Sequence, residues 1–215
     1  MLNACTNRTM KNFGLAVVGL FSLCAAQSAM ADIRVFAAGG LTNQTPESGS
    51  TASTKALTGA EGKLAGHIDI FGPIPGVSIY AGPELHVGTA IREYDDATAV
   101  KAKETIKSNA LGLEAGVHVG LIPIITVQAG LNYNFPSGGS KEEVVKVTGT
   151  VTGTVTGNAS KGSETGATVR ALITPFPMTR LGVEYSMGSG STTYETHGEM
   201  KYSFWAARAV FGIAI

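Results

Sequence analysis

The chain has 215 residues, of which 15% are charged and 28 are glycines, and its formal net charge is zero. This length suits a single β-barrel or sandwich domain, and no stretch has the composition of an interdomain linker. Because positive and negative charges balance, the chain lacks the basic field that nucleic-acid-binding proteins carry, and that class of partner is excluded.

The first 31 residues differ in character from the rest. Lys11 supplies a positive charge, residues 13–26 form an apolar run, and residues 28–31 end it with small side chains. This pattern predicts a secretory signal peptide cleaved after Ala31, with a true start that could lie at Met10. The apolar run is shorter than the ~20 residues of a membrane-spanning helix. We therefore expect an exported protein whose mature part is a single domain, residues 32–215.

Both cysteines of the chain, Cys5 and Cys24, lie in this leader. A mature chain without thiols has no disulfide, no catalytic thiol and no cysteine metal site. Leu23 stands where a lipoprotein acylation site requires a small residue, so lipidation at Cys24 is not expected.

Beyond Ala31, apolar and polar residues alternate in several segments, as they do in β-strands. In residues 77–92, Ile79 and Leu85 share one parity, while Glu84 and His86 share the other. The segments with this alternation are residues 33–41, 64–71, 77–92, 111–121, 125–135, 167–175, 181–187 and 203–215. No later apolar stretch reaches the length of a transmembrane helix, so membrane insertion would require strands closed into a barrel.

The connections between these segments alternate in length. Short ones lie at residues 72–76, 122–123 and 175–178, and long polar ones at residues 42–62, 93–105, 136–165 and 188–199. Small outer-membrane barrels pair short periplasmic turns with long outer loops in the same way. The prediction is an all-β, antiparallel, up-and-down transmembrane β-barrel of eight strands.

A repeated Val-Thr-Gly-Thr unit in residues 147–157 also alternates like a strand. One extra crossing would give an odd number of strands, so we interpret the repeat as part of a hairpin that extends the third outer loop into solvent. Ten strands would result if both arms of this hairpin crossed the membrane, and this remains the alternative.

The two faces of the strands favour a membrane barrel over a soluble one. The polar face is mostly Gly, Ala, Ser and Thr with isolated charges of both signs, which suits a narrow lumen. The other face consists of aliphatic residues, as contact with hydrocarbon requires, since a Lys or Arg at the midplane costs about 2–4 kcal/mol. Aromatic residues on the apolar face form a partial girdle, consisting of Tyr133, Phe135, Tyr185, Trp205 and Phe211.

With these features the chain resembles the small outer-membrane barrel families typified by OmpA and OmpX. In those families the C-terminal strand alternates apolar and polar residues and ends on an aromatic residue, which the assembly machinery recognises. Here Trp205 and Phe211 follow the alternation, but the last residue is Ile215. The resemblance implies a Gram-negative outer membrane, contacts with its lipid and lipopolysaccharide, recognition by the barrel-assembly machinery, and a monomer. The peptidoglycan-binding domain of many OmpA-like proteins is not expected here.

The candidate site consists of charged residues at the alternate strand positions that are predicted to face the lumen. They form a predicted ionic network of Asp69, Glu84, His86, Arg92, Glu114, His118, Arg170, Glu184 and Arg208, and Lys63, His67 and Arg180 share their parity. Buried charges are costly when unpaired, so we predict salt bridges that link Glu84, Glu114 and Glu184 to Arg170 and Arg208. Polar residues at every second position occur in any barrel lumen, so the spacing of the His and Glu residues does not by itself indicate a metal site. Neither a metal nor a cofactor is expected.

Two functions stay open at this point. The first is a structural or surface-interaction role carried by the outer loops, and the second is a narrow, porin-like pore for small solutes. Eight strands leave an interior that side chains just fill, which favours the first, whereas the many small lumen residues favour some opening. No catalytic constellation is recognisable among loop residues such as Asp95, Asp96, Ser189 and His197, so an enzyme is not expected.

Overall fold

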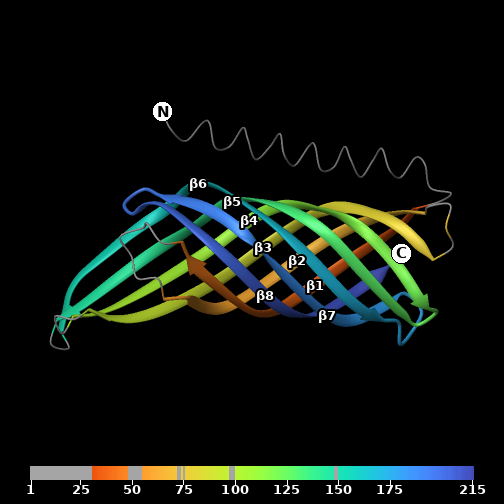
Figure 1. Cartoon of the computed structure of the whole chain (residues 1–215), viewed down its shortest axis with the longest axis horizontal. Helices are drawn as coiled ribbons and strands as arrows, with labels where there is room; N and C mark the ends of the chain where they lie inside the picture. Colours follow the sequence, from red (N-terminus) through yellow and green to blue (C-terminus); the bar gives the residue numbers. More distant parts are fainter. Residues whose placement is uncertain (1–30, 48–54, 72–73, 75, 97–99, 148–149) are drawn as a thin grey trace.

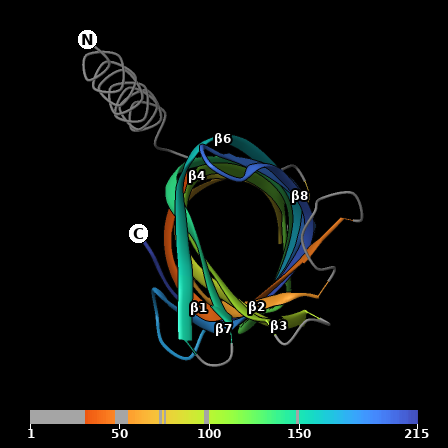
Figure 2. The same ribbon diagram turned by 90° about the vertical axis from the view of Figure 1, so that its left-hand side faces the viewer.

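In the computed structural model of the chain, antiparallel strands form a closed ring (Figures 1 and 2). The structure describes residues 31–47, 55–71, 74, 76–96, 100–147 and 150–215. Over these residues the strands are β1 (Ala31–Pro46), β2 (Leu57–Phe71), β3 (Val77–Asp96), β4 (Val100–Ile122), β5 (Ile125–Val147), β6 (Thr150–Ile173), β7 (Thr179–Tyr194) and β8 (Gly198–Ala214). Each strand pairs with the next, and β8 pairs with β1. The predicted up-and-down barrel of eight strands is confirmed, and the ten-strand alternative is wrong.

The two ends of the barrel differ in their connections. At one end, here called the turn end, β2–β3, β4–β5 and β6–β7 are joined by short turns, and the first and last strands meet there through two hydrogen bonds between the backbones of Ile33 and Ile215. In the first turn Gly76 has a φ of 77°, a conformation that glycine adopts without steric cost, and its carbonyl accepts a hydrogen bond from the N–H of Gly120. The opposite end, where the other hairpins close, is called the hairpin end.

The strands run much further toward the hairpin end than the sequence predicted. Most of the four segments expected to be long loops are paired strand, and β4, β5 and β6 reach 23, 23 and 24 residues. The repeat in residues 147–157 starts on the last residue of β5 and continues along β6, as expected for a hairpin that extends the wall. The prediction failed for these segments because their outer faces are polar, and it had relied on an apolar outer face to recognise a strand.

Apolar side chains cover the outside of the barrel around its turn-end half. Leu131 is 72% exposed and Leu41 is 65% exposed, whereas Arg170 and Gln128, on the inner face, are fully buried. The aromatic residues of the predicted girdle all lie on the outer face, and Tyr133 and Phe135 pack edge to face. A barrel in water would present the reverse polarity, so this surface matches a bilayer. None of the described residues forms a helix that is long and apolar enough to cross a membrane.

Two apolar clusters lie inside the barrel. The turn-end cluster consists of Phe36, Ala65, Leu172 and Val210. The hairpin-end cluster consists of Leu57, Ala90, Ile106, Tyr194, Met200, Tyr202 and Phe204. Along β8 the inward residues run from Val210 through Arg208 to Phe204, so a charged layer lies between the two clusters.

Candidate functional site in the lumen

Charged side chains from six strands converge in this middle layer of the lumen. They are Lys63 on β2, Glu84 on β3, Glu114 on β4, Arg170 on β6, Glu184 on β7 and Arg208 on β8, here called the central network. Each is at most 4% exposed. They meet because inward positions alternate along every strand, and the ring of strands is narrow enough for long side chains to reach across it.

Arg170 joins two carboxylates of the central network. Its guanidinium Nη atoms bind the two carboxylate oxygens of Glu114 at 2.5 and 2.7 Å, and its Nε donates to Glu184. Glu114 also accepts a hydrogen bond of 2.7 Å from the hydroxyl of Tyr80. Two-pronged pairing of this kind is the strongest that arginine makes with carboxylates, and it fixes the positions of both partners.

Lys63 and Arg208 complete the pairing. The Lys63 amine lies 2.6 Å from Glu84 and 2.9 Å from Glu114, while Arg208 lies 2.5 Å from Glu184. Arg208 also binds Glu61 at 2.7 Å. The charged groups of the layer are thus connected by one continuous set of ion pairs and hydrogen bonds.

Glu84 differs from the prediction, which linked it to Arg170 or Arg208. Its carboxylate pairs instead with Lys63 and, at 3.1 Å, with His86. The reason is the register of β2 and β3, which places Lys63 directly opposite His86 and therefore diagonal to Glu84 on the neighbouring strand.

The other residues of the predicted network lie in two separate groups. At the turn end, Asp69 binds Arg34 and His118, each at 2.8 Å, and accepts a hydrogen bond from Ser78. At the hairpin end, Arg92 binds Glu104 at 2.5 Å, and Lys141 lies 3.0 Å from the other oxygen of Glu104. The nine predicted residues therefore occupy three levels of the lumen, of which only the middle one is a large network.

Five charged lumen residues were missed by the sequence analysis: Arg34, Glu61, Glu104, Lys141 and Glu164. The last four lie in segments that had been interpreted as loops, where no inward face was assigned. Arg34 lies within a predicted strand and has the parity of its lumen face, so the alternation alone could have identified it.

The central network is suited to closing the lumen. When Glu61 is included, the layer holds three cations and four carboxylates. His86 lies between two of these carboxylates, 2.5 Å from Glu61 and 3.1 Å from Glu84. Each of these charges has at least one partner of opposite charge, and such pairing offsets the cost of removing the charges from water. Toward the turn end, the ring of Phe36 lies under Arg170 at 5.6 Å and that of His67 stacks on Tyr80. Within the described ranges, no three His, Asp or Glu residues are placed to hold a metal ion.

The closed ring, its apolar outer surface and its ionic interior define a small outer-membrane β-barrel protein. No protein-family model matches the chain, and no curated protein matches it.

Several solved structures are similar to the chain. Neisserial surface protein A is 10% identical, with 85% of this chain and 96% of that chain covered and a TM-score of 0.45. A major outer membrane protein from Thermus thermophilus is 18% identical, with 86% and 99% covered and a TM-score of 0.47. The outer membrane protease OmpT from Escherichia coli is 9% identical, with 87% and 97% covered and a TM-score of 0.40. Similarity at this level supports no statement about activity.

The single tryptophan tests the membrane-facing surface. Trp205 is 41% exposed on the outer face of β8, and we expect lipids brominated on their acyl chains to quench its fluorescence strongly in reconstituted vesicles. As a control, Phe204→Trp in a Trp205→Phe background places the indole one residue away on the inner face, where quenching should be weak. Equal quenching of the two proteins would contradict the assignment of the faces.

Proposed function

We propose that the protein is exported by a signal peptide removed after Ala31, inserts into the outer membrane with its turn end toward the periplasm, and acts at the cell surface through its hairpin end. The observation that carries this proposal is the length of β4, β5 and β6, with 23 to 24 residues each. A tilted strand needs only about 9–11 residues to cross the hydrocarbon. More than half of each of these strands therefore extends beyond the bilayer.

The extension is suited to binding because its backbone is already ordered. Residues of β5 and β6 pair up to Val147 and Thr150, so the two arms of the extension are ordered as paired strands. Near the tip, Thr154, Val155 and Thr156 are all exposed. A partner that binds such a hairpin avoids most of the entropy cost of ordering it.

The membrane contacts of the barrel follow from the same orientation. The apolar belt would contact the lipid, and the polar surface above it would contact the sugars and phosphates of lipopolysaccharide. The C-terminal strand, in which outward Phe211 and Ile213 alternate with inward residues, would be the segment that the assembly machinery recognises. A monomer suffices for this arrangement, because the ring closes on itself.

The surface role is tested by shortening the hairpin. A variant that lacks residues 143–155, with Glu142 and its partner Thr156 joined by Asn-Gly, keeps the membrane part and removes the tip. We expect the wild-type barrel to make bacteria attach to immobilised matrix proteins or aggregate with one another. Bacteria that carry the variant should lose this attachment or aggregation. Surface amounts of both proteins are matched by antibody labelling. Attachment that is unchanged by the deletion, or absent with the wild type, would contradict the proposal.

A further inference from the structure

The wall of the barrel is interrupted between β5 and β6. The strands pair up to Asn134 opposite Glu164, and pairing resumes at Ser140 opposite Asn158. The register is the same on both sides of the interruption. Residues 135–139 and 159–163 therefore face each other without being paired.

Irregularities in both strands produce this interruption. In β5, Ser137 is skipped in the pairing with β4, and in β6, Ser160 is skipped in the pairing with β7. Such bulges bend a strand and leave a residue outside the ladder. Pro136 has no N–H to donate across the gap, and Gly139 has a φ of 128°, which other residues rarely adopt. The local sequence thus disfavours a continuous ladder at this point.

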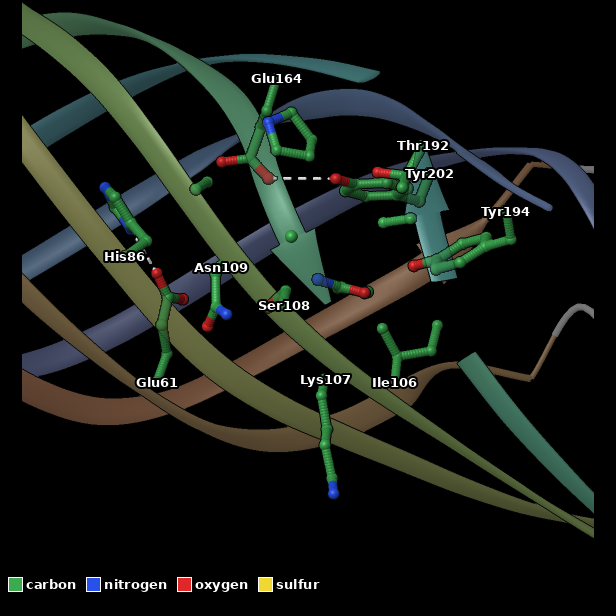
Figure 3. A pocket seen from close by; sticks show the side chains of 15 residues that line it. Glu61, His86, Ile106, Lys107, Ser108, Asn109, Glu164, Thr192, Tyr194 and Tyr202 are labelled. Atoms are coloured by element: carbon green, nitrogen blue, oxygen red, sulfur yellow. Dashed lines mark hydrogen bonds and ion pairs between the residues drawn. The ribbon is translucent and has the colours of Figure 1, made fainter. Parts of the chain in front are cut away.

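A cavity of about 40 Å³ lies behind the interruption (Figure 3). Its inner lining includes Glu164, Tyr194 and Tyr202, which face the lumen, and its outer lining includes Asn109 and Gly138 beside the gap. At about 10–15 Å³ for each water, the space holds about three waters or one small polar group. Pro136, Gly138 and Ala159, which line the cavity, belong to the two unpaired stretches, so the cavity lies directly against the interruption.

The interruption lies at the upper edge of the apolar belt. Of the aromatic girdle, Tyr133 lies just before it on β5 and Phe135 is its first residue, and both are more than 40% exposed. Aromatic residues of this kind mark the boundary between hydrocarbon and headgroups. The interruption therefore lies at the level of the headgroups, where water and small solutes are present.

Glu164 has an unusual position among the lumen carboxylates. It accepts hydrogen bonds from the amide of Asn134 at 3.0 Å and from the hydroxyl of Tyr202 at 3.3 Å. In the described part of the chain it has no Lys or Arg within ion-pair distance, unlike Glu61 and each carboxylate of the central network. Lys107 also lines the cavity, but Figure 3 shows its side chain pointing away from Glu164. A carboxylate beside the ring of Tyr202, in a cavity that Tyr194 also lines, suits an ammonium group, which pairs with the charge and with ring faces.

We propose that the β5–β6 interruption is a side opening in the barrel wall, and that through it the ammonium group of a small primary amine reaches Glu164. The ammonium donates to the Glu164 carboxylate and lies against Tyr194 and Tyr202. This site is independent of the surface role of the hairpin tip, because it lies inside the barrel and below the tip.

The site is tested with methylammonium as the probe and the mature barrel in lipid nanodiscs. Nuclear magnetic resonance should detect saturation transfer from the tyrosine rings to the methyl group of the probe. Glu164→Gln should weaken binding about tenfold or more, as expected for the loss of one charge-assisted hydrogen bond. Glu47→Gln, which removes an exposed carboxylate, is the matched control and should bind as the wild type does. Wild-type affinity in Glu164→Gln, or no binding by the wild type, would overturn the proposal.

The route is tested with single cysteines, since both natural cysteines precede the described barrel. Ser160→Cys, capped with a bulky maleimide, should slow the exchange of methylammonium, because residue 160 lies at the gap. Ser203→Cys, capped in the same way on the outer face of β8, should leave exchange unchanged. Circular dichroism verifies that both barrels are folded. Equal exchange in the two capped proteins would show that the amine enters by another path, and would overturn the side opening.

Discussion

Replacing Arg170 by methionine is expected to lower the free energy of unfolding by about 3–5 kcal/mol, the usual cost of removing one partner from a buried ion pair. Arg170 is fully buried and binds both Glu114 and Glu184. Without it, Glu114 would keep Lys63, at 2.9 Å, as its close cationic partner, and Glu184 would keep Arg208, at 2.5 Å, and Lys63, at 3.6 Å. The loss is large because the carboxylates of Glu114 and Glu184 stay buried when their partner is removed.

The measurement is urea unfolding of the barrel refolded in lipid vesicles, followed by circular dichroism. Arg180→Met is the matched control, since Arg180 is only half-buried and donates to the backbone carbonyl of its own neighbour, Thr179. Its effect should stay below about 1 kcal/mol. Adding Glu114→Gln to Arg170→Met should restore part of the stability, because it removes a carboxylate that has lost its partner. Equal effects of the two arginine variants would contradict the central role of Arg170.

In planar bilayers we expect the wild-type barrel to insert without producing discrete conductance steps. The central network fills the middle of the lumen, and the turn-end cluster closes the next layer with Phe36, Leu172 and Val210. Single replacements, Arg170→Ala or Glu84→Ala, should also be silent, since the turn-end cluster remains. Steps should be recorded only when both layers are opened, as in Phe36→Ala combined with Arg170→Ala, whose side chains are in contact.

This measurement also decides between the two functions considered from the sequence. Insertion of each protein is verified by protection of the membrane part from protease. Discrete steps from the wild type, altered in Arg170→Ala, would make the lumen a path for solutes and support the narrow pore. Silence of the double variant, with insertion verified, would show that the hairpin-end cluster closes the lumen by itself.

The sequence predicted the membrane-spanning half of each strand because two requirements act there at once. Lipid demands apolar residues outside and the narrow lumen demands small or paired polar residues inside, so the alternation is strong. Beyond the bilayer the outer face becomes polar and the alternation weakens. Residues 93–105 show this: Lys103 is exposed and Glu104 is buried, yet both are charged, so no pattern distinguishes a strand from a loop.

The candidate site was predictable in composition but not in its pairing. Parity assigned Glu114, Arg170 and Glu184 to the lumen, and the structure places all three there. Which charges touch depends on the register of neighbouring strands and on reach across the ring, as the pairing of Glu84 with Lys63 demonstrates. The interruption between β5 and β6 depends on the bulges at Ser137 and Ser160, and Pro136 and Gly139 were its visible signs in the sequence.

The change from apolar to charged residues along the outer face of the strands also fixes how deep the barrel sits in the bilayer. Along β4 the outward residues change from Leu113 and Val117 to Lys103 and Lys107, while the inward ones change from Glu114 to Ile106. A barrel pushed further into the membrane would bring lysines toward the hydrocarbon, at up to about 2–4 kcal/mol each. A barrel pulled outward would expose its apolar belt to water. The strands therefore anchor the protein vertically, and they hold the hairpin tip at a set height above the membrane surface.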